Sequence, residues 1–386
     1  MDFVILDEKN ELVTPAISYR DERTIGMEEF VDKIIPFEQL YEQTGIQRQI
    51  FNTIYQLTAL KKDNPNALQR GKNFLMLPDY FHFLLTGIVV NEYTEASTSS
   101  LVNAEGKNWD WDLIKSLGLP TEIFSNLTVP GVVLGRFTDD VREKVGFDCD
   151  VTLPPSHDTA SAYLAVPTTA QDAIYISSGT WSLMGIESAV PITSQYARDG
   201  NFTNEGGYAY RFRFLKNIMG LWMIQSVRKE TGEKYSFPEL SNMAKESGPP
   251  VAIVNVDDRA FFAPESMITA VKETAKRTGQ TVPESLGQVV QCIYHSLAQC
   301  YADTAKQLER ATGRKYSTLH TFGGGSQDNY LNQLTAKATG LKVFAGPTEA
   351  TAIGSIIVQM MAKGELGSLE EGKKLIEDSF PITEVV

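Results

Sequence analysis

The stretch that decides the fold is PPSHDTASAYLAVPTTAQDAIYISSGTWSLMG, which spans residues 154–185. Its first part places Asp158 at the start of a helix of small residues. Its second part predicts an apolar strand over 173–176, a Ser-Ser-Gly-Thr turn that ends at Thr180, and a returning strand. Such a hairpin presents backbone N–H groups and small hydroxyls that can bind an anion. An acid beside a phosphate-binding turn indicates chemistry on a hydroxyl group next to a nucleotide.

The residues around Asp158 leave two interpretations open. An acid at a helix start is commonly an N-cap. It is also a candidate general base that takes a proton from a substrate hydroxyl as the hydroxyl attacks phosphorus. Ser156 and His157 precede it. Adjacent residues generally do not point at one another, and the sequence has no G-x-S-x-G motif, so we exclude a hydrolase triad.

A strand–turn–helix–strand–helix unit is predicted near the end of the chain. A strand over 317–322 runs into Gly323, Gly324 and Gly325, and the next helix ends at Gly340. Glycines after a strand let a ligand approach the N–H groups of a helix N-terminus, where the helix dipole favours anions. From the residues alone, this turn is either an ordinary loop or a nucleotide-binding loop. It matches neither a Walker loop nor G-x-G-x-x-G, which argues against P-loop and Rossmann enzymes.

Hydrophobic spacing predicts further helices. One covers 44–60. A long one covers 283–311, with a capping box formed by Thr281 and Glu284. A third is predicted to begin at Asn217, which places Gln225 two turns later on the same face. From periodicity alone, Asn217 is a helix cap and Gln225 a surface amide.

Composition narrows the class of protein. A length of 386 residues indicates two domains. No apolar run approaches the roughly 20 residues that cross a bilayer, and the first residues form no leader, so we expect a cytoplasmic protein. A net charge of −13 disfavours nucleic acid and anionic membranes as partners. Three cysteines and four scattered histidines indicate neither a disulfide framework nor a zinc site.

Several motifs together resemble one family. These motifs are SHDTASAY, ISSGTWSLMG, TNEGG, LKNIMGLWMIQ, GGGSQDNYLNQLTAKATG and GPTEATAIGSI. In order and spacing they resemble the FGGY carbohydrate kinases over the whole chain, and most closely those members that act on L-rhamnulose. The resemblance implies an α/β fold of two ribonuclease-H-like domains, as in the actin/Hsp70/sugar kinase superfamily, around a cleft. It implies a sugar-binding N-terminal domain over 1–165 and a nucleotide-binding C-terminal domain over 166–386.

The resemblance also implies roles for residues. Asp158 matches the catalytic base of the family, and His157 matches a sugar contact. Nucleotide contacts are implied for Thr180, Asn217, Gln225, Gly323, Gly324 and Gly325. ATP and Mg²⁺ are the implied cofactors. The implied reaction of rhamnose metabolism is phosphorylation of L-rhamnulose at its 1-hydroxyl, with L-fuculose and D-xylulose as alternative substrates.

The N-terminal end departs from the family pattern. Family members begin with a D-x-G-x-x-S/T-x-R-like hairpin for ATP phosphates and Mg²⁺, followed by a loop that closes on the sugar. This sequence has neither and opens on a strand pattern. We therefore expect the first strands of the N-terminal domain to be missing. The alternative function is a truncated chain with little kinase activity that only binds ligand. No residue is predicted to bind a metal directly.

Overall fold

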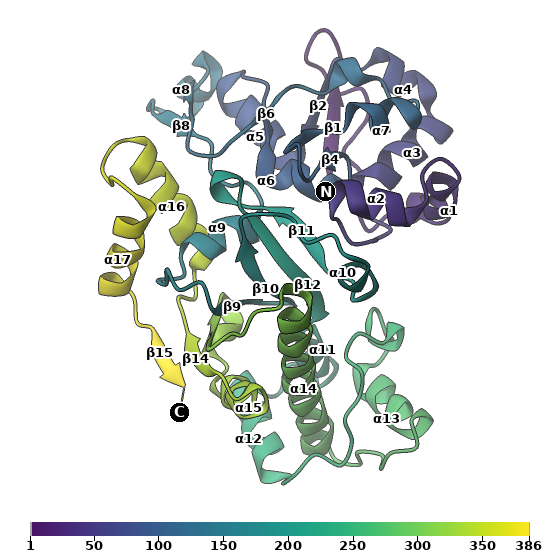
Figure 1. Cartoon of the computed structure of the whole chain (residues 1–386), viewed down its shortest axis with the longest axis vertical. Coiled ribbons are helices and arrows are strands. Elements are labelled where there is room, and N and C mark those ends of the chain that lie inside the picture. Colours follow the sequence, from purple (N-terminus) through teal and green to yellow (C-terminus); the bar gives the residue numbers. More distant parts are fainter. Residues whose placement is uncertain (1, 386) are drawn as a thin grey trace. The chain divides into compact units, whose positions relative to one another are not determined.

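The computed structural model describes residues 2–385. The described residues form two compact units (Figure 1). Unit 1 lies within Met1–Ala165, Glu187–Phe214 and Thr351–Gly372, and unit 2 within Val166–Ile186, Leu215–Ala350 and Lys373–Val386. Each unit is described below by itself. The division into domains over 1–165 and 166–386 stays a prediction.

Unit 1 combines many helices with short strands. Its elements are β1 (Phe3–Leu6), α1 (Met27–Asp32), α2 (Phe37–Thr44), α3 (Thr53–Asp63), α4 (Pro65–Arg70), β2 (Asn73–Met76), α5 (Leu77–Thr86), β3 (Asn91–Glu92), α6 (Tyr93–Ala96), β4 (Val102–Asn103), β5 (Asn108–Trp109), α7 (Trp111–Ser116), β6 (Leu127–Thr128), β7 (Val133–Arg136), α8 (Asp139–Val145), β8 (Asp150–Thr152), α9 (Asp158–Leu164), α10 (Gln195–Asp199), β11 (Thr203–Gly206) and most of α16 (Ala350–Ala362). β1 pairs antiparallel with β2, and the buried faces of these strands join the helices in one apolar core.

The helix expected over 44–60 is wrong in its first half. α2 ends at Thr44, and Gly45 follows with φ +68°. The Gly45 carbonyl accepts hydrogen bonds from the backbone and the side chain of Asn204 instead of continuing a helix. A Cβ at Gly45 would lie 2.9 Å from the Asn204 side chain. The next helix, α3, therefore begins only at Thr53.

Unit 2 contains, wholly or in part, every strand except β11 of a seven-stranded sheet with the order β11-β12-β10-β9-β13-β14-β15. Its further elements are β9 (Ala173–Ser178), β10 (Trp181–Ser188), β12 (Phe212–Met219), α11 (Trp222–Glu230), α12 (Phe237–Glu246), α13 (Met267–Arg277), α14 (Leu286–Thr312), β13 (Thr318–Phe322), α15 (Asn329–Thr339), β14 (Lys342–Ala345), α17 (Leu369–Ser379) and β15 (Thr383–Val385). The boundary between the units passes through β10, β12 and α17. β9 pairs antiparallel with β10, as the hairpin pattern predicted, and parallel with β13.

The long helix α14 packs beside this sheet (Figure 1). The hydroxyls of Tyr301 on α14 and Ser182 on β10 are buried and lie 2.6 Å apart. The predicted helix is confirmed, but its capping box is not the expected Thr281–Glu284 pair. Ser285 caps the helix and Gln288 bonds back to it, because the chain over 281–284 is still outside the helix.

The prediction that Asn217 begins a helix is wrong. Asn217 lies within the strand β12, and the helix α11 starts only at Trp222. Gly220 lies between them, where an added Cβ would collide with the backbone of Trp181 and Ser182. This close approach lets β12 run its full length beside β10 before the chain turns. Asn217 and Gln225 therefore do not share a helix face.

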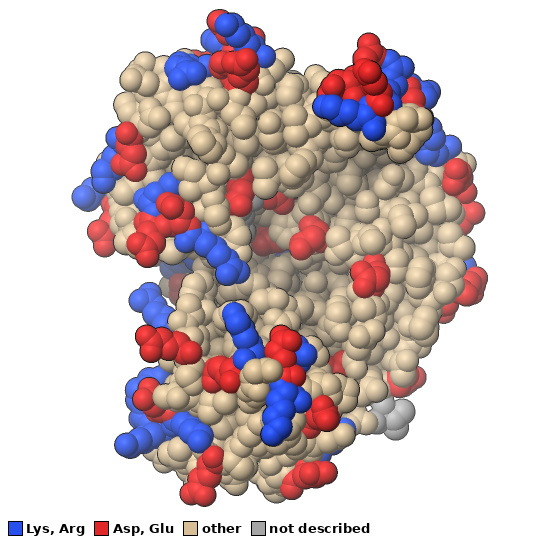
Figure 2. All heavy atoms as spheres, turned by 180° about the vertical axis from the view of Figure 1, so that it is seen from behind, with Lys and Arg blue, Asp and Glu red and all other residues tan. Residues whose placement is uncertain are grey.

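The surface mixes charges of both signs. On the face drawn in Figure 2, Lys and Arg side chains lie among Asp and Glu side chains. Examples from α8 are the ion pairs of Lys144 with Asp140 and of Arg142 with Asp139. Among the helices of residues 2–385, none has both the length and the apolar character needed to span a bilayer.

Candidate active site

Asp158 is the first residue of α9, and a tightly packed backbone supports it. The small residues of this helix allow α16 to come close, since a Cβ on Gly354 would collide with the carbonyl of Ser161. Thr351 of α16 also donates a hydrogen bond to the backbone carbonyl of Asp158, at 3.3 Å. The start of α9 is thus held by contacts far along the chain.

The carboxylate of Asp158 is exposed and ionised. Its side chain is 78% exposed. Oδ1 accepts hydrogen bonds from the backbone N–H and the hydroxyl of Thr159, whereas Oδ2 accepts none from the described residues. The hydrogen bond with His157 holds the pKa of Asp158 well below its usual range, and the bonds from Thr159 add to this effect. At neutral pH one carboxylate oxygen is therefore available to a ligand.

His157 is the N-cap of α9, a position that the sequence also left open for Asp158. Its Nδ1 accepts a hydrogen bond from the backbone N–H of Thr159 at 3.2 Å. The same Nδ1 lies 3.3 Å from Oδ1 of Asp158. Burial and the charge of Arg213 lower the pKa of His157, but the hydrogen bond with Asp158 and the charge of Glu205 outweigh them, so the pKa is raised.

Glu92 anchors the segment in front of α9. Its buried carboxylate accepts hydrogen bonds from the backbone N–H and the hydroxyl of Thr94 and from the N–H groups of Glu95 and Ser156. Thr94 in turn accepts a hydrogen bond from the backbone N–H of His157, at 3.2 Å. Burial raises the pKa of Glu92 to about 7 although the hydrogen bonds oppose it. These bonds fix where α9 begins.

Two residues of this site were missed by the sequence analysis. Most of the TNEGG motif forms the strand β11, and its Glu205 side chain is 6% exposed. On β12, Arg213 is 1% exposed and pairs with Glu205 at 3.1 Å. The sequence did contain a signal for this ion pair. Arg213 stands between two phenylalanines, and an arginine that is buried with such neighbours needs a buried acceptor.

In unit 2, the predicted nucleotide residues Thr180 and Gln225 are close together. Thr180 lies in the turn between β9 and β10, and its hydroxyl donates to the side-chain carbonyl of Gln225 at 3.4 Å. The backbone N–H groups of Leu221 and Trp222 bond to the carbonyls of Gly179 and Thr180. The start of α11 is therefore tied to this turn.

The turn formed by Gly323, Gly324 and Gly325 lies beside the end of the strand β9. Gly323 has φ +82°, and a Cβ on Gly325 would collide with the hydroxyl of Ser178 at the end of β9. A Cβ on Gly324 would meet no described atom within 4 Å, so its backbone is open to a ligand. Asn217 makes no side-chain hydrogen bond to this group through Oδ1, which is buried and has no hydrogen-bond partner among the described residues.

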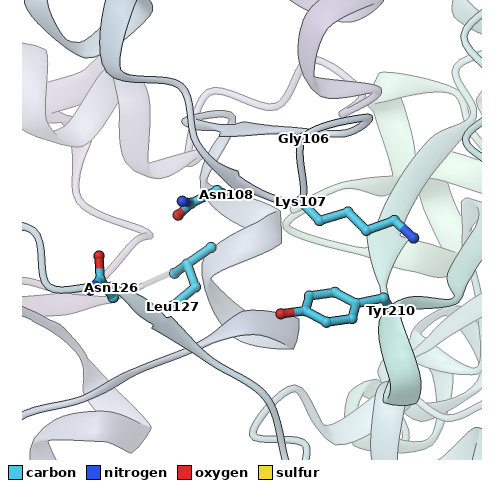
Figure 3. Close-up of a pocket in the computed structure, with 6 residues that line it drawn as sticks. All are labelled: Gly106, Lys107, Asn108, Asn126, Leu127 and Tyr210. Atoms are coloured by element: carbon cyan, nitrogen blue, oxygen red, sulfur yellow. The ribbon is translucent and has the colours of Figure 1, made fainter.

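A pocket of unit 1 contains none of the predicted site residues. It has a volume of about 370 Å³ and is lined by Gly106, Lys107, Asn108, Asn126, Leu127 and Tyr210 (Figure 3). The Lys107 ammonium lies 5.5 Å from the ring centre of Tyr210. The Tyr210 ring also packs edge-on against Tyr93, the residue after Glu92. The pocket therefore lies next to the segment around Glu92 that anchors the start of α9.

The carboxylate of Asp158 can bind Mg²⁺ only when a bound ligand supplies further oxygen atoms. Within residues 2–385, no group of three or more His, Cys, Asp and Glu side chains could hold a metal ion. Mg²⁺ is usually bound through one or two carboxylates and substrate phosphates rather than by a cage of side chains. The free Oδ2 of Asp158 fits that mode of binding. Whether Asp158 faces Thr180 and Gly324 across a cleft stays a prediction.

Comparison with known proteins covers nearly the whole chain. The N-terminal domain of the FGGY family of carbohydrate kinases matches residues 1–165, and the C-terminal domain of the same family matches residues 174–363. A rhamnulokinase of Halalkalibacterium halodurans is 49% identical over 387 residues, which cover 100% of this chain and 82% of that protein. A rhamnulokinase of Bacillus subtilis is 39% identical over 383 residues, which cover 99% of this chain and 78% of that protein.

Solved structures share the fold. A gluconate kinase from Lactobacillus acidophilus has a TM-score of 0.82 at 16% identity, over 99% of this chain and 77% of that one. A glycerol kinase from Plasmodium falciparum, solved with ADP, has a TM-score of 0.79 at 15% identity over the same shares. The two family matches and these structural similarities confirm the predicted two-domain α/β fold of sugar kinases. Together with the sequence matches they show that the chain belongs to the FGGY family of carbohydrate kinases.

Proposed function

We propose that this chain transfers the terminal phosphoryl group of ATP to the 1-hydroxyl of L-rhamnulose. Support comes from rhamnulokinases that are 39–49% identical over essentially the whole chain. The observation that carries the proposal is the exposed, ionised carboxylate of Asp158, with one free oxygen, on a rigidly anchored helix start. L-Fuculose, D-xylulose and a chain that only binds ligand are the alternatives to be tested.

In this mechanism Asp158 orients the sugar hydroxyl and accepts its proton. Transfer of a phosphoryl group proceeds through a loose transition state, so positioning matters more than strong basicity. The low pKa of Asp158 suits that role, because the carboxylate stays ionised and accepts the proton late in the reaction. His157, held beside it, contacts the sugar.

The nucleotide is assigned to unit 2. Thr180 and the open backbone at Gly324 bind the phosphates, with Gly323 and Gly325 shaping the turn. Asn217 and Gln225 contact the rest of the nucleotide. Mg²⁺ neutralises phosphate charge when it is bound. The proposal includes a sugar-binding domain over 1–165 and a nucleotide-binding domain over 166–386.

The test replaces Asp158 by Asn and measures turnover in a coupled assay with ATP, Mg²⁺ and L-rhamnulose, L-fuculose or D-xylulose. A general base typically contributes about 10²–10⁴-fold. We expect Asp158→Asn to lower kcat by that factor while ADP binding, measured by calorimetry, is unchanged. Asp139→Asn is the matched control, because Asp139 is also the first residue of an exposed helix, α8.

Three results would contradict the proposal. Near-normal turnover in Asp158→Asn would remove this residue from the chemistry. A higher kcat/KM for L-fuculose or D-xylulose than for L-rhamnulose would change the substrate. Binding of ADP by the unmodified chain without turnover of any of the sugars would leave only the ligand-binding alternative.

A further inference from the structure

We propose that Glu205 and Arg213 are positioning residues, which set the tautomer and the ring orientation of His157 and thereby the place of Asp158. This inference rests on the proposed function for its kinetic consequence. Its structural content does not depend on which sugar is phosphorylated.

The three side chains converge on one point inside unit 1. Oε2 of Glu205 lies 3.1 Å from Nη1 of Arg213 and 3.5 Å from Nε2 of His157. Nη1 of Arg213 lies 3.4 Å from Nδ1 of His157. The imidazole is therefore flanked by a carboxylate at one nitrogen and a guanidinium at the other.

The guanidinium is held in place independently of His157. Nε and Nη2 of Arg213 both donate to the backbone carbonyl of Gly206, at 3.2 and 3.1 Å. The two bonds use one edge of the planar group and leave Nη1 aimed at the other two side chains. An arginine buried this completely is costly to desolvate unless its donors are satisfied. Its position is thus set by the backbone of the hairpin.

This arrangement selects one neutral form of the imidazole. Nδ1 faces two donors, Nη1 of Arg213 and the backbone N–H of Thr159, and one acceptor, Oδ1 of Asp158 at 3.3 Å. In the neutral ring the two donors make Nδ1 the acceptor, so Nε2 carries the proton. In the imidazolium both nitrogens carry protons, and the Nδ1–H group donates to Oδ1 of Asp158. Oε2 of Glu205 is buried and has no partner in hydrogen-bond geometry among the described residues. It is the acceptor available to the Nε2–H group. The hydrogen bond on one ring nitrogen fixes the role of the other.

The acidic residues around the ring act on its charge. Oδ1 of Asp158, the first residue of α9, lies 3.3 Å from Nδ1, Glu205 comes from β11, and the charge of Glu95 on α6 also reaches His157. Arg213 acts in the opposite direction. Removing the charge of Glu205 removes one group that favours the imidazolium, so the titration of His157 is expected to move to lower pH.

The hairpin that carries both residues is closed by an unusual turn. Ala209 and Tyr210, between β11 and β12, have φ +53° and +58°. Two central residues with positive φ are typical of a type I′ turn, which favours Asn-Gly. The Tyr210 ring packs against Tyr93. It also lies near the Lys107 ammonium (Figure 3). The tip of the hairpin is therefore fastened to unit 1 close to the site.

The experiment uses the whole chain and three variants. Glu205→Gln keeps the shape and removes the charge, and Arg213→Lys keeps the charge and loses the planar group. Glu187→Gln is the matched control, because Glu187 pairs with Arg211 at 3.5 Å in the same unit. Nitrogen-15 NMR of the four histidine rings reports the tautomer and titration of His157, and steady-state kinetics report kcat and KM over pH.

We expect unmodified His157 to carry its neutral proton on Nε2. Glu205→Gln should shift its titration to lower pH and decrease kcat by about 10- to 100-fold, as for other orienting partners, with the KM for ATP unchanged. Arg213→Lys should disturb the tautomer, and Glu187→Gln should change nothing. If the unmodified chain had no kinase activity, the proposed function would be wrong. The NMR measurement of the His157 tautomer and titration would still test whether Glu205 and Arg213 position this ring.

Three outcomes would overturn the inference. The first is a neutral His157 that carries its proton on Nδ1 in the unmodified chain, a result that does not depend on the folding of any variant. The second is an unchanged His157 titration in Glu205→Gln. The third is a loss of kcat in Glu187→Gln equal to that in Glu205→Gln.

Discussion

Replacing Glu92 by Gln should change how the stability of the protein depends on pH. Glu92 and its neighbour Asp79 are both completely buried. Both oxygens of Asp79 accept from the backbone N–H of Glu92, and burial followed by the charge of Glu92 raises the pKa of Asp79 well above its usual value. Burial therefore favours the protonated form of both carboxyl groups, and the pKa of Glu92 lies near neutrality.

The magnitude follows from the pKa of Glu92. Burial raises this pKa from 4.5 to about 7. The unfolded chain holds the proton only below about pH 4.5, whereas the folded chain holds it to about pH 7. Between these values the folded state binds more protons, so the free energy of unfolding falls as the pH rises, by about 3 kcal/mol. The contribution is present below pH 4.5 and lost above pH 7.

Gln cannot titrate, and it fits the site less well. Oε2 of Glu92 accepts three hydrogen bonds and Oε1 accepts one from the backbone N–H of Thr94. The amide oxygen of Gln can replace Oε2, which leaves its NH₂ group facing the N–H of Thr94. A buried donor without an acceptor costs about 1–3 kcal/mol. The variant should therefore be less stable at pH 5 and equally or more stable at pH 8.

Urea unfolding followed by tryptophan fluorescence at pH 5, 6, 7 and 8 measures this difference. Glu239→Gln is the control, since Glu239 is an exposed capping residue whose pKa is lowered by its bonds to Ser236. Glu239 titrates below the measured pH range. The free energy of unfolding of Glu239→Gln should therefore change with pH in parallel with that of the unmodified chain. Parallel curves for Glu92→Gln as well would refute the buried, titrating carboxylate.

Two further predictions concern the backbone. Gly354→Ala should destabilise the protein by about 1–3 kcal/mol, because the new Cβ collides with the carbonyl of Ser161. Thermal denaturation measures this loss. The control is Gly367→Ala, where the new Cβ meets only the far end of a glutamate side chain. No difference between these two variants would contradict the close approach of α16 to α9. Ala209→Gly should stabilise by about 0.5–1 kcal/mol, because a left-handed conformation is unfavourable for a residue with a Cβ. A lower denaturation midpoint would show that this conformation carries no strain.

Local patterns were enough for those parts of the fold in which neighbours along the chain decide the structure. The strand–turn–strand of β9 and β10, the glycine turn after β13 and the helix that ends at Gly340 were all predicted. Turn residues, glycine caps and hydrophobic periods act within a few residues, so they can be read from the sequence. The position of Asp158 at a helix start belongs to this class.

Contacts between distant segments decided the rest. Asn204 ended a predicted helix at Gly45, and the close passage of Gly220 by β10 kept Asn217 in a strand. Asp158 was a candidate general base from its position at a helix start, and the family resemblance predicted site roles for both Asp158 and His157. Their surroundings, with Glu92, Glu205 and Arg213, come from three other segments of the chain. A buried charge is stable only beside a partner, and no local pattern shows which distant residue that partner is.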